Sequence, residues 1–434
     1  MPGSNNGSRI LTVARLFFLL MVIPLLLISS LIAFSIYNIG GMSKADTMSA
    51  LDKTSQLEIS VRAGDLAQTI ASFLSERNRD VLIATILDTS KETYKSFLDT
   101  KTDAVWVRKD EGIVKEQMPL YVEMSLIDEA GNEIIKVANG KIVPEDQLLN
   151  VLDPANTTYK SEDYFLRAKE LRKGEVYVSE VTGWYVDKAD FYQGKRFNGI
   201  IRMATPLFDK QGFTGVVSLA LDARHLAKFT DNIIPTETAY VIEADASTGN
   251  YAYMVDNEGY VVSHPNDYHI RGLYRDGNPV PHITAENQND MVAKGQEVLN
   301  FFHMGEIVDP ALPEVATEAI RGKSGIKSYS FDGHTKMLAY APIPFYSPNH
   351  PAPGGFGWVG MGVDVEKYNE QAMITSERID REAQIWLATI IIIIVLALVI
   401  LFAIAAILSR GINRSIKSEV PPEALRPPQY DEDD

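Results

Sequence analysis

Cysteine is absent from the 434 residues of the chain. This absence excludes structural disulfides, thiolate nucleophiles and cysteine-ligated zinc sites. The folded state must therefore be stabilised by its hydrophobic core, and 46% of the residues are hydrophobic. A chain of this length can build two cores of ordinary domain size.

Charge is absent from two long runs, Leu16–Ser43 and Ile385–Ser409. Each run exceeds the ~20 residues with which an α-helix crosses a bilayer. The sequence thus predicts transmembrane helices at 16–40 and 385–409. Arg9 and Arg15 precede the first run as they would in a signal peptide, but its apolar part is too long for one, so we expect an uncleaved anchor.

Basic residues lie before the first run and after the second. Arg9 and Arg15 precede the first run, and Arg410, Arg414 and Lys417 follow the second. The positive-inside rule therefore places residues 1–15 and 410–434 in the cytoplasm and residues 44–380 outside. An external domain of this size without cysteine favours a bacterial or archaeal cytoplasmic membrane.

Positive charge is in deficit: the formal net charge is −16, and all of it lies between residues 44 and 382. This balance argues against nucleic acid and anionic lipid as partners. Enzyme signatures are missing too, since there is no His-Glu-x-x-His, Gly-x-Ser-x-Gly or glycine-rich phosphate loop. The seven histidines lack metal-ligand spacing, so we predict no catalytic residue, no metal and no cofactor.

Proline is absent between Lys44 and Ser75, and the apolar residues there recur at helical spacing. We predict a long helix over 44–100 that rises from the membrane. Its apolar stripe has two interpretations, pairing with a second subunit as a homodimer or packing on the chain's own domain.

Strand and turn signals follow Pro119 and occur twice in the same order. Each set has a hairpin, a long insertion and two or three further strands, which suggests two related α/β modules over about 80–232 and about 235–368. The expected strands are 120–127, 133–137, 175–181, 199–206, 215–222, 251–256, 259–264, 325–331, 335–342 and 357–363. A helix is expected at 161–173, and another from 365 to the second span.

Several of these segments resemble the double-Cache sensor domain of bacterial chemoreceptors and sensor histidine kinases. The similar segments are Ser161–Phe165, Gly174–Ser179, Ala204–Asp209 with Gly215–Val217, Met254–Pro265, Tyr340–Pro344 and Gly357–Val359. The resemblance covers nearly all of 44–380. It implies an α+β fold of two PAS-like antiparallel-sheet modules on the long N-terminal helix, flanked by two transmembrane helices.

The resemblance also implies a ligand pocket in the membrane-distal module. The corresponding residues are Trp184, Tyr185, Tyr192, Arg202 and Asp222. Aromatic rings suit the walls of such a pocket, and an arginine fork binds a carboxylate bidentately. Members that bind amino acids have an arginine before the Trp-Tyr pair and an aspartate where this chain has Ala220. Another small metabolite, such as a carboxylate, therefore fits better than an α-amino acid, and a module without a ligand is the alternative.

Each of these residues also has a structural interpretation. Trp184 and Tyr185 fit the core of a sheet equally well. Arg202 lies between Ile201 and Met203, so its side chain could face solvent, and Asp222 precedes a helix start, as an N-cap does.

The C-terminal segment indicates how a signal would be passed on from the second transmembrane helix. Arg410–Ile416 resembles the start of a HAMP linker, but Pro421-Pro422 and Pro427-Pro428 then exclude a helix, so we expect no output domain after it. We therefore expect a ligand sensor that signals through its transmembrane helices to a separate, unknown partner; a receptor that has lost its output domain is the other interpretation of this ending. A different class is also open, a scaffold whose ectodomain binds another envelope protein.

Overall fold

The computed structural model describes residues 5–109, 112–237, 240–331, 333–365 and 370–419. It contains two compact units, Met1–Lys53 with Glu370–Asp434 and Thr54–Asn369. Helix α1 (Asn5–Ala84) contributes residues to both units, and helix α9 (Glu370–Glu419) belongs to the first. The segment 420–434, where the proline pairs stand, lies outside the described residues.

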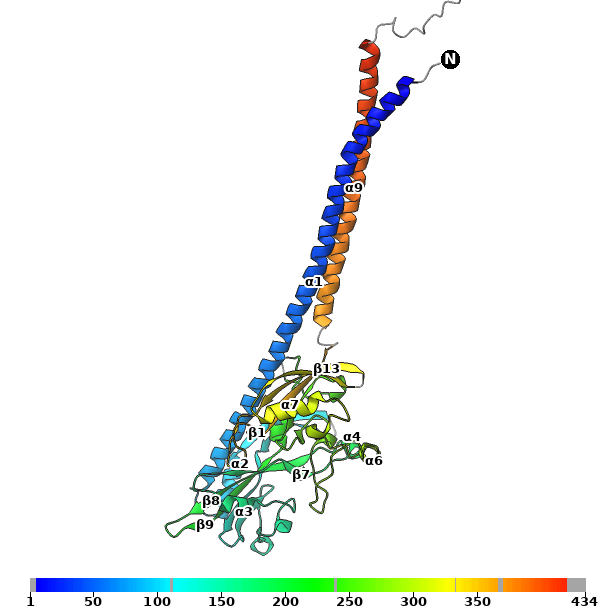
Figure 1. The fold of residues 1–434 in the computed structure, drawn as a ribbon. Coiled ribbons are helices and arrows are strands. Elements are labelled where there is room, and N and C mark those ends of the chain that lie inside the picture. Colours follow the sequence, from blue (N-terminus) through cyan, green and yellow to red (C-terminus); the bar gives the residue numbers. More distant parts are fainter. Residues whose placement is uncertain (1–4, 110–111, 238–239, 332, 366–369, 420–434) are drawn as a thin grey trace, which may run out of the picture. The chain divides into compact units, whose positions relative to one another are not determined.

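The first unit contains two helices that are long and apolar enough to cross a membrane. The candidate spans are Phe18–Asp46, with a mean hydropathy of 2.6, and Met373–Leu408, with 3.7. In this unit α1 and α9 run antiparallel and side by side (Figure 1), since the rings of Phe18 and Phe402 lie 6.2 Å apart and Lys44 Nζ lies 2.6 Å from Asp380 Oδ2. Both spans overlap the predicted ranges.

The helix predicted over 44–100 is divided in the structure. Helix α1 ends at Ala84, and α2 (Lys91–Thr100) begins after a short turn. Ser90 is the N-cap of α2, and its hydroxyl accepts a hydrogen bond from the Thr93 amide. A serine in this position starts a new helix rather than continuing the old one.

The distal module is built on an antiparallel sheet in the order β5-β4-β3-β9-β8-β6, with β7 also paired to β8. Its strands are β3 (Tyr121–Asp128), β4 (Glu133–Ala138), β5 (Lys141–Ile142), β6 (Tyr177–Val178), β7 (Thr182–Trp184), β8 (Asn198–Phe208) and β9 (Phe213–Asp222). Its short helices are α3 (Tyr164–Lys169), α4 (Lys188–Tyr192) and α5 (Arg224–Asp231). The predicted helix 161–173 is thus reduced to α3, and the strand 175–181 to β6.

The proximal module has a five-stranded antiparallel sheet in the order β11-β10-β14-β13-β12. Its strands are β10 (Tyr251–Val255), β11 (Val261–Ser263), β12 (Gly325–Phe331), β13 (His334–Pro342) and β14 (Trp358–Asp364). Helices α6 (Gln288–Ala293) and α7 (Ala311–Ile320) lie in the long insertion between β11 and β12. Every strand predicted in this module is present.

A hairpin that the sequence analysis missed precedes the distal sheet. Strands β1 (Thr102–Lys109) and β2 (Gly112–Pro119) pair with each other from Thr102↔Pro119 to Lys109↔Gly112 and form a separate two-stranded sheet. Valine and aromatic residues, which favour strands, stand at Val105, Trp106, Val107 and Val114, and Gly112 at the start of β2 has a φ of +125°. These are ordinary hairpin signals.

The two sheets repeat the same turn. The Asp128 carboxylate accepts hydrogen bonds from the amides of Ala130 and Asn132, and the Asp256 carboxylate accepts them from Glu258 and Tyr260. In each turn a glycine with positive φ occupies the third position after the aspartate. This local repeat supports two modules of one design.

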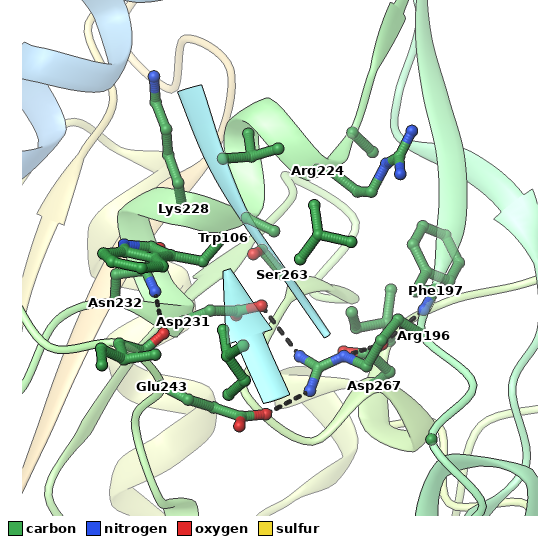
Figure 2. Close-up of a pocket in the computed structure, with 18 of the residues that line it drawn as sticks. Trp106, Arg196, Phe197, Arg224, Lys228, Asp231, Asn232, Glu243, Ser263 and Asp267 are labelled. Carbon is green, nitrogen blue, oxygen red and sulfur yellow. Dashed lines mark hydrogen bonds and ion pairs between the residues drawn. The ribbon is translucent and has the colours of Figure 1, made fainter. Parts of the chain in front are cut away.

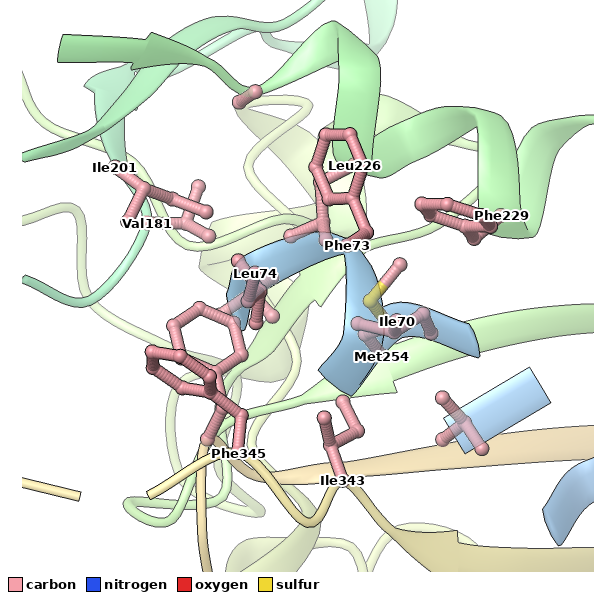
Figure 3. Packing of buried hydrophobic residues seen from close by; sticks show 14 of the residues in the cluster. Ile70, Phe73, Leu74, Val181, Ile201, Leu226, Phe229, Met254, Ile343 and Phe345 are labelled. Carbon is pink, nitrogen blue, oxygen red and sulfur yellow. The ribbon is translucent and has the colours of Figure 1, made fainter. Parts of the chain in front are cut away.

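The hydrophobic core joins the two modules through α1. Ile70, Phe73 and Leu74 of α1 are buried. Around them lie side chains from both modules (Figure 3), namely Val181, Ile201, Leu226 and Phe229 from the distal one and Met254, Ile343 and Phe345 from the proximal one. The apolar stripe of this part of α1 is therefore used within the chain itself.

Candidate functional site

Arg202 is the centre of a charge cluster on one face of the distal sheet. The register of β3, β9 and β8 aligns Glu123 with Ala220, and Ala220 with Arg202. The Arg202 side chain is only 1% exposed. Its Nη1 donates to Glu123 Oε1 at 2.5 Å and its Nε to Glu162 Oε1 at 2.8 Å, while the guanidinium lies 4.6 Å from the ring centre of Tyr164. The arginine therefore faces the interior and not the solvent.

Both carboxylates have further partners. Glu123 Oε2 accepts a hydrogen bond from the Thr158 hydroxyl at 2.8 Å and lies 3.5 Å from Lys136 Nζ, and Glu162 Oε2 accepts from the Tyr159 amide at 3.1 Å. Burial alone would raise the pKa of Glu123, but Arg202 and Lys136 outweigh it and hold the pKa at about 2. The guanidinium fork is thus already bound by two anionic groups of the chain.

Three of the five predicted site residues share this face. Asp222 on β9 pairs with Ile200, two residues before Arg202 on β8, and Trp184 pairs with Asn198, two residues before Ile200. Alternate residues of a strand lie on the same face, so these side chains share the face of Arg202. The Trp184 ring lies 5.1 Å from that of Tyr159. Asp222 is buried and lies on this face, where its carboxylate accepts hydrogen bonds from the Arg224 amide and side chain. The N-cap position of α5 is held by Ala223, so the structure does not make Asp222 the N-cap.

Tyr185 and Tyr192 lie elsewhere. Successive side chains of a strand point to opposite faces, so Tyr185 turns away from Trp184. Its hydroxyl donates to the Tyr268 carbonyl at 2.9 Å and accepts from the Glu297 amide at 2.9 Å, both in the proximal module. Tyr192, at the end of α4, is 71% exposed. The structure does not bring these two tyrosines to Arg202.

The sequence analysis did not identify Glu123, Glu162 or Tyr164 as members of this cluster. Glu123 had a detectable signal, because a charged residue in the middle of the apolar run 120–127 requires a partner if it is buried. Glu162 and Tyr164 belong to a segment that contributed to the family resemblance. Their contact with Arg202 depends on the tertiary fold, because 40 residues separate Glu162 from Arg202.

A second feature is a cavity of about 270 Å³ between the two modules (Figure 2). Strands β1 and β2 contribute one wall through Val105, Trp106, Val107 and Ile113. Another wall carries Arg196, which binds three carboxylates: Asp231 and Asp267 at 3.0 Å and Glu243 at 2.9 Å. Arg196 and Asp231 belong to the distal module, whereas Glu243 and Asp267 belong to the proximal one.

Burial alters the acid–base properties of this second cluster. It raises the pKa of Asp231 to about 7, against the opposing effect of Arg196, and the neighbouring Asp267 adds to the rise. The pKa of Asp267 is also raised by burial, again against Arg196. The positive charge of Arg196 therefore does not offset the effect of burial on the pKa values of Asp231 and Asp267.

Comparison with known proteins identifies the family. The family model of the Cache domain dCache_1 matches residues 46–367. No curated protein matches the chain.

Solved structures that match the chain include the ligand-binding domains of chemoreceptors and the extracellular domain of a histidine kinase. The chemoreceptor CtaA of Pseudomonas fluorescens with L-isoleucine is 16% identical, with a TM-score of 0.41, over 74% of this chain and 98% of that one. The histidine kinase vpHK1S-Z8 is 15% identical, with a TM-score of 0.42, over 76% and 96%. The chemoreceptor PctC of Pseudomonas aeruginosa PAO1 with GABA is 14% identical, with a TM-score of 0.39, over 73% and 100%. Because the family model matches residues 46–367, most of the chain's length, the chain belongs to the dCache_1 family of Cache domains.

Proposed function

We propose that the chain is a membrane-anchored extracytoplasmic sensor whose distal module binds a small carboxylate at Arg202. The buried guanidinium of Arg202, held by Glu123 and Glu162, carries this proposal. An arginine fork is the group best suited to bind a carboxylate, and here the chain itself supplies two such ligands. A carboxylate metabolite would bind by replacing one of them.

Glu162 is the exchangeable partner in this mechanism. Glu123 is fixed on strand β3 and is also bound by Thr158 and Lys136. Glu162 comes from the irregular segment before α3, outside the sheet. When a metabolite takes its place on Arg202, this segment loses its ion pair with β8, which allows it to shift. The two states would then differ in a contact that the ligand controls directly.

The signal would leave through the two terminal helices. Helix α1 contributes to the cores of both modules, and both termini would lie in the cytoplasm, with the ectodomain outside the bacterial or archaeal membrane. A small displacement of these helices would reach a separate membrane or cytoplasmic partner, and a homodimer would place two copies of each helix together.

The test is a thermal-shift screen of the full chain in lipid nanodiscs against mono- and dicarboxylates. Ligand that binds only the folded state raises the melting temperature by mass action. Glu162→Gln removes the anionic competitor and should tighten binding by about tenfold, whereas Arg202→Met should abolish it. Asp163→Asn, one residue away and exposed, is the matched control and should bind like the parent chain. Binding that is equal in all four proteins, or no binding by any carboxylate, would contradict the site.

A further inference from the structure

The cavity between the modules is lined by apolar side chains from several elements. Strands β1 and β2, helix α5 and strand β11 each supply at least one of them. The aliphatic residues of the lining include Val105, Val107, Ile113, Ile242, Val262 and Ile270. Figure 2 shows Trp106 and Phe197 on opposite sides of the cavity. Most of the surface that a ligand would meet here is therefore apolar.

The charged groups that line the same cavity are already paired within the chain. Arg196 binds its three carboxylates, Lys228 binds Asp103, and Arg224 binds Asp222. A charged ligand would have to separate one of these ion pairs and also lose its own hydration, and both changes cost free energy. A neutral ligand does neither.

The neutral polar side chains of the walls have partners too. Asn232 Nδ2 donates a hydrogen bond to the Ile242 carbonyl oxygen at 2.6 Å, and the hydroxyl groups of Ser263 and Thr230 share one at 2.6 Å. Burial raises the pKa of Asp231 to about 7, so these surroundings disfavour a further negative charge. Among the described lining residues, the surface that remains for a ligand is mainly hydrocarbon and aromatic.

Trp106 and the volume of the cavity define the kind of ligand. Trp106 is 37% exposed, and Lys115 Nζ lies 5.7 Å from its ring centre. A cation near this ring disfavours a second one, whereas another aromatic ring can pack against it. An apolar cavity of about 150 Å³ holds a benzene molecule, so by proportion the 270 Å³ here hold about ten non-hydrogen atoms. This is the size of one substituted ring or two fused rings.

We propose that this cavity is a second ligand site, separate from Arg202, that binds a small neutral aromatic molecule. The ring of the ligand packs against Trp106 and the valines of β1. The described lining does not include Arg202, Glu123 or Glu162, so the site does not depend on carboxylate binding there. Because both modules contribute to the walls, the bound molecule fills the space between them and connects them by apolar contact.

The test uses the full chain in lipid nanodiscs with ethylbenzene and indole as probes. Benzylammonium, which has the shape of ethylbenzene but carries a positive charge, is the control ligand. Because the neutral probes also partition into lipid, binding is measured against the free concentration of each probe. We expect at least one of the two neutral probes to raise the melting temperature saturably, and benzylammonium to have no such effect.

A variant that fills the cavity assigns the effect to this site. Ala227 lies on α5 and lines the cavity, so Ala227→Leu should occupy part of the space and abolish the shift in melting temperature. Ala293→Leu, at an exposed position of α6, is the matched control and should bind the probe like the parent chain. Trp106→Ala should weaken binding by about fivefold through the loss of ring packing.

Three results overturn the proposal: neither neutral probe stabilises the chain, benzylammonium stabilises it equally well, or Ala227→Leu binds the probe like the parent chain. The last result would place the probe in the bilayer or elsewhere on the chain. If Ala227→Leu does not fold, unchanged binding in Trp106→Ala overturns the proposal in the same way.

Discussion

At the scale of single residues, buried charges are retained only where partners compensate the loss of water. Arg202 satisfies this condition with Glu123 and Glu162, and Arg196 satisfies it with three carboxylates. The pKa values of carboxyl groups in the two clusters are shifted in opposite directions: that of Glu123 is lowered, whereas that of Asp231 is raised. Glu123 is therefore ionised at neutral pH, whereas Asp231 takes up a proton as the pH falls below about 7.

Replacing Arg202 by methionine should destabilise the chain strongly. The change leaves Glu123 and Glu162 buried without their main partner, which costs about 3–5 kcal/mol of unfolding free energy near neutral pH. The loss should shrink as the pH falls and the stranded carboxylates become protonated. Denaturant unfolding of the full chain measures both effects. Arg167→Met removes an exposed arginine paired with Asp163 and should have little effect; equal losses in the two variants would contradict this account.

Asp231→Asn should flatten the pH dependence of stability. The pKa of Asp231 is about 7 in the folded chain, above the ~3.9 of an unfolded aspartate, so the folded state holds more protons between these values. Stability from this group is therefore present at low pH and is lost as the pH rises toward 7. Arg196, Asp267, Glu243 and Thr230 remain around the neutral asparagine.

Between about pH 4 and 7, the free energy of unfolding should fall less steeply with pH in Asp231→Asn than in the parent chain. The two slopes should differ by the equivalent of about one bound proton. Asp163→Asn, at an exposed position, should keep the parent slope. An unchanged slope in Asp231→Asn would show that this carboxyl group does not take up the proton.

At the scale of elements, turn residues made most strands predictable from the sequence. The aspartate-glycine turns at 128–131 and 256–259 placed both hairpins correctly. The β1–β2 hairpin has comparable signals, but it follows a helical segment with no intervening proline or glycine, and it was missed. The candidate site was harder to predict than the strands, because residues adjacent in the sequence have partners in different modules. Trp184 packs on Tyr159, whereas Tyr185 binds Tyr268. The partners of Arg202 come from distant segments, and no local pattern connects them.

Equivalent glycines in the two modules should be equally intolerant of a side chain. A Cβ on Gly215 would lie 2.1 Å from the Ile127 carbonyl oxygen, and one on Gly357 would lie 2.3 Å from that of Val255. Both have positive φ, +154° and +121°. We expect Gly215→Ala and Gly357→Ala each to cost about 1–3 kcal/mol or more in denaturant unfolding.

Gly64→Ala is the control for these two variants. Gly64 lies inside α1 with nothing within 4 Å of its virtual Cβ, so alanine should stabilise the chain by about 0.5–1 kcal/mol. If all three variants behaved alike, the backbone contacts at Gly215 and Gly357 would not be the cause.

At the scale of the whole molecule, the absence of cysteine permits a direct test of the proposed topology. A single cysteine at Lys210, in an exposed turn, should react with a membrane-impermeant maleimide on intact spheroplasts. A single cysteine at position 418 should react only after the membrane is permeabilised, because the positive-inside rule places it in the cytoplasm. Reaction at both positions in intact spheroplasts would contradict the two-span topology.

The shared packing on α1 has a consequence for how the ectodomain melts. Ile70, Phe73 and Leu74 lie in one cluster with side chains from both sheets, so neither module can lose its core while the other remains intact. Two sheets of separate topology should therefore behave as a single cooperative unit. Scanning calorimetry should show one endotherm for both modules, with a calorimetric enthalpy equal to the van't Hoff value.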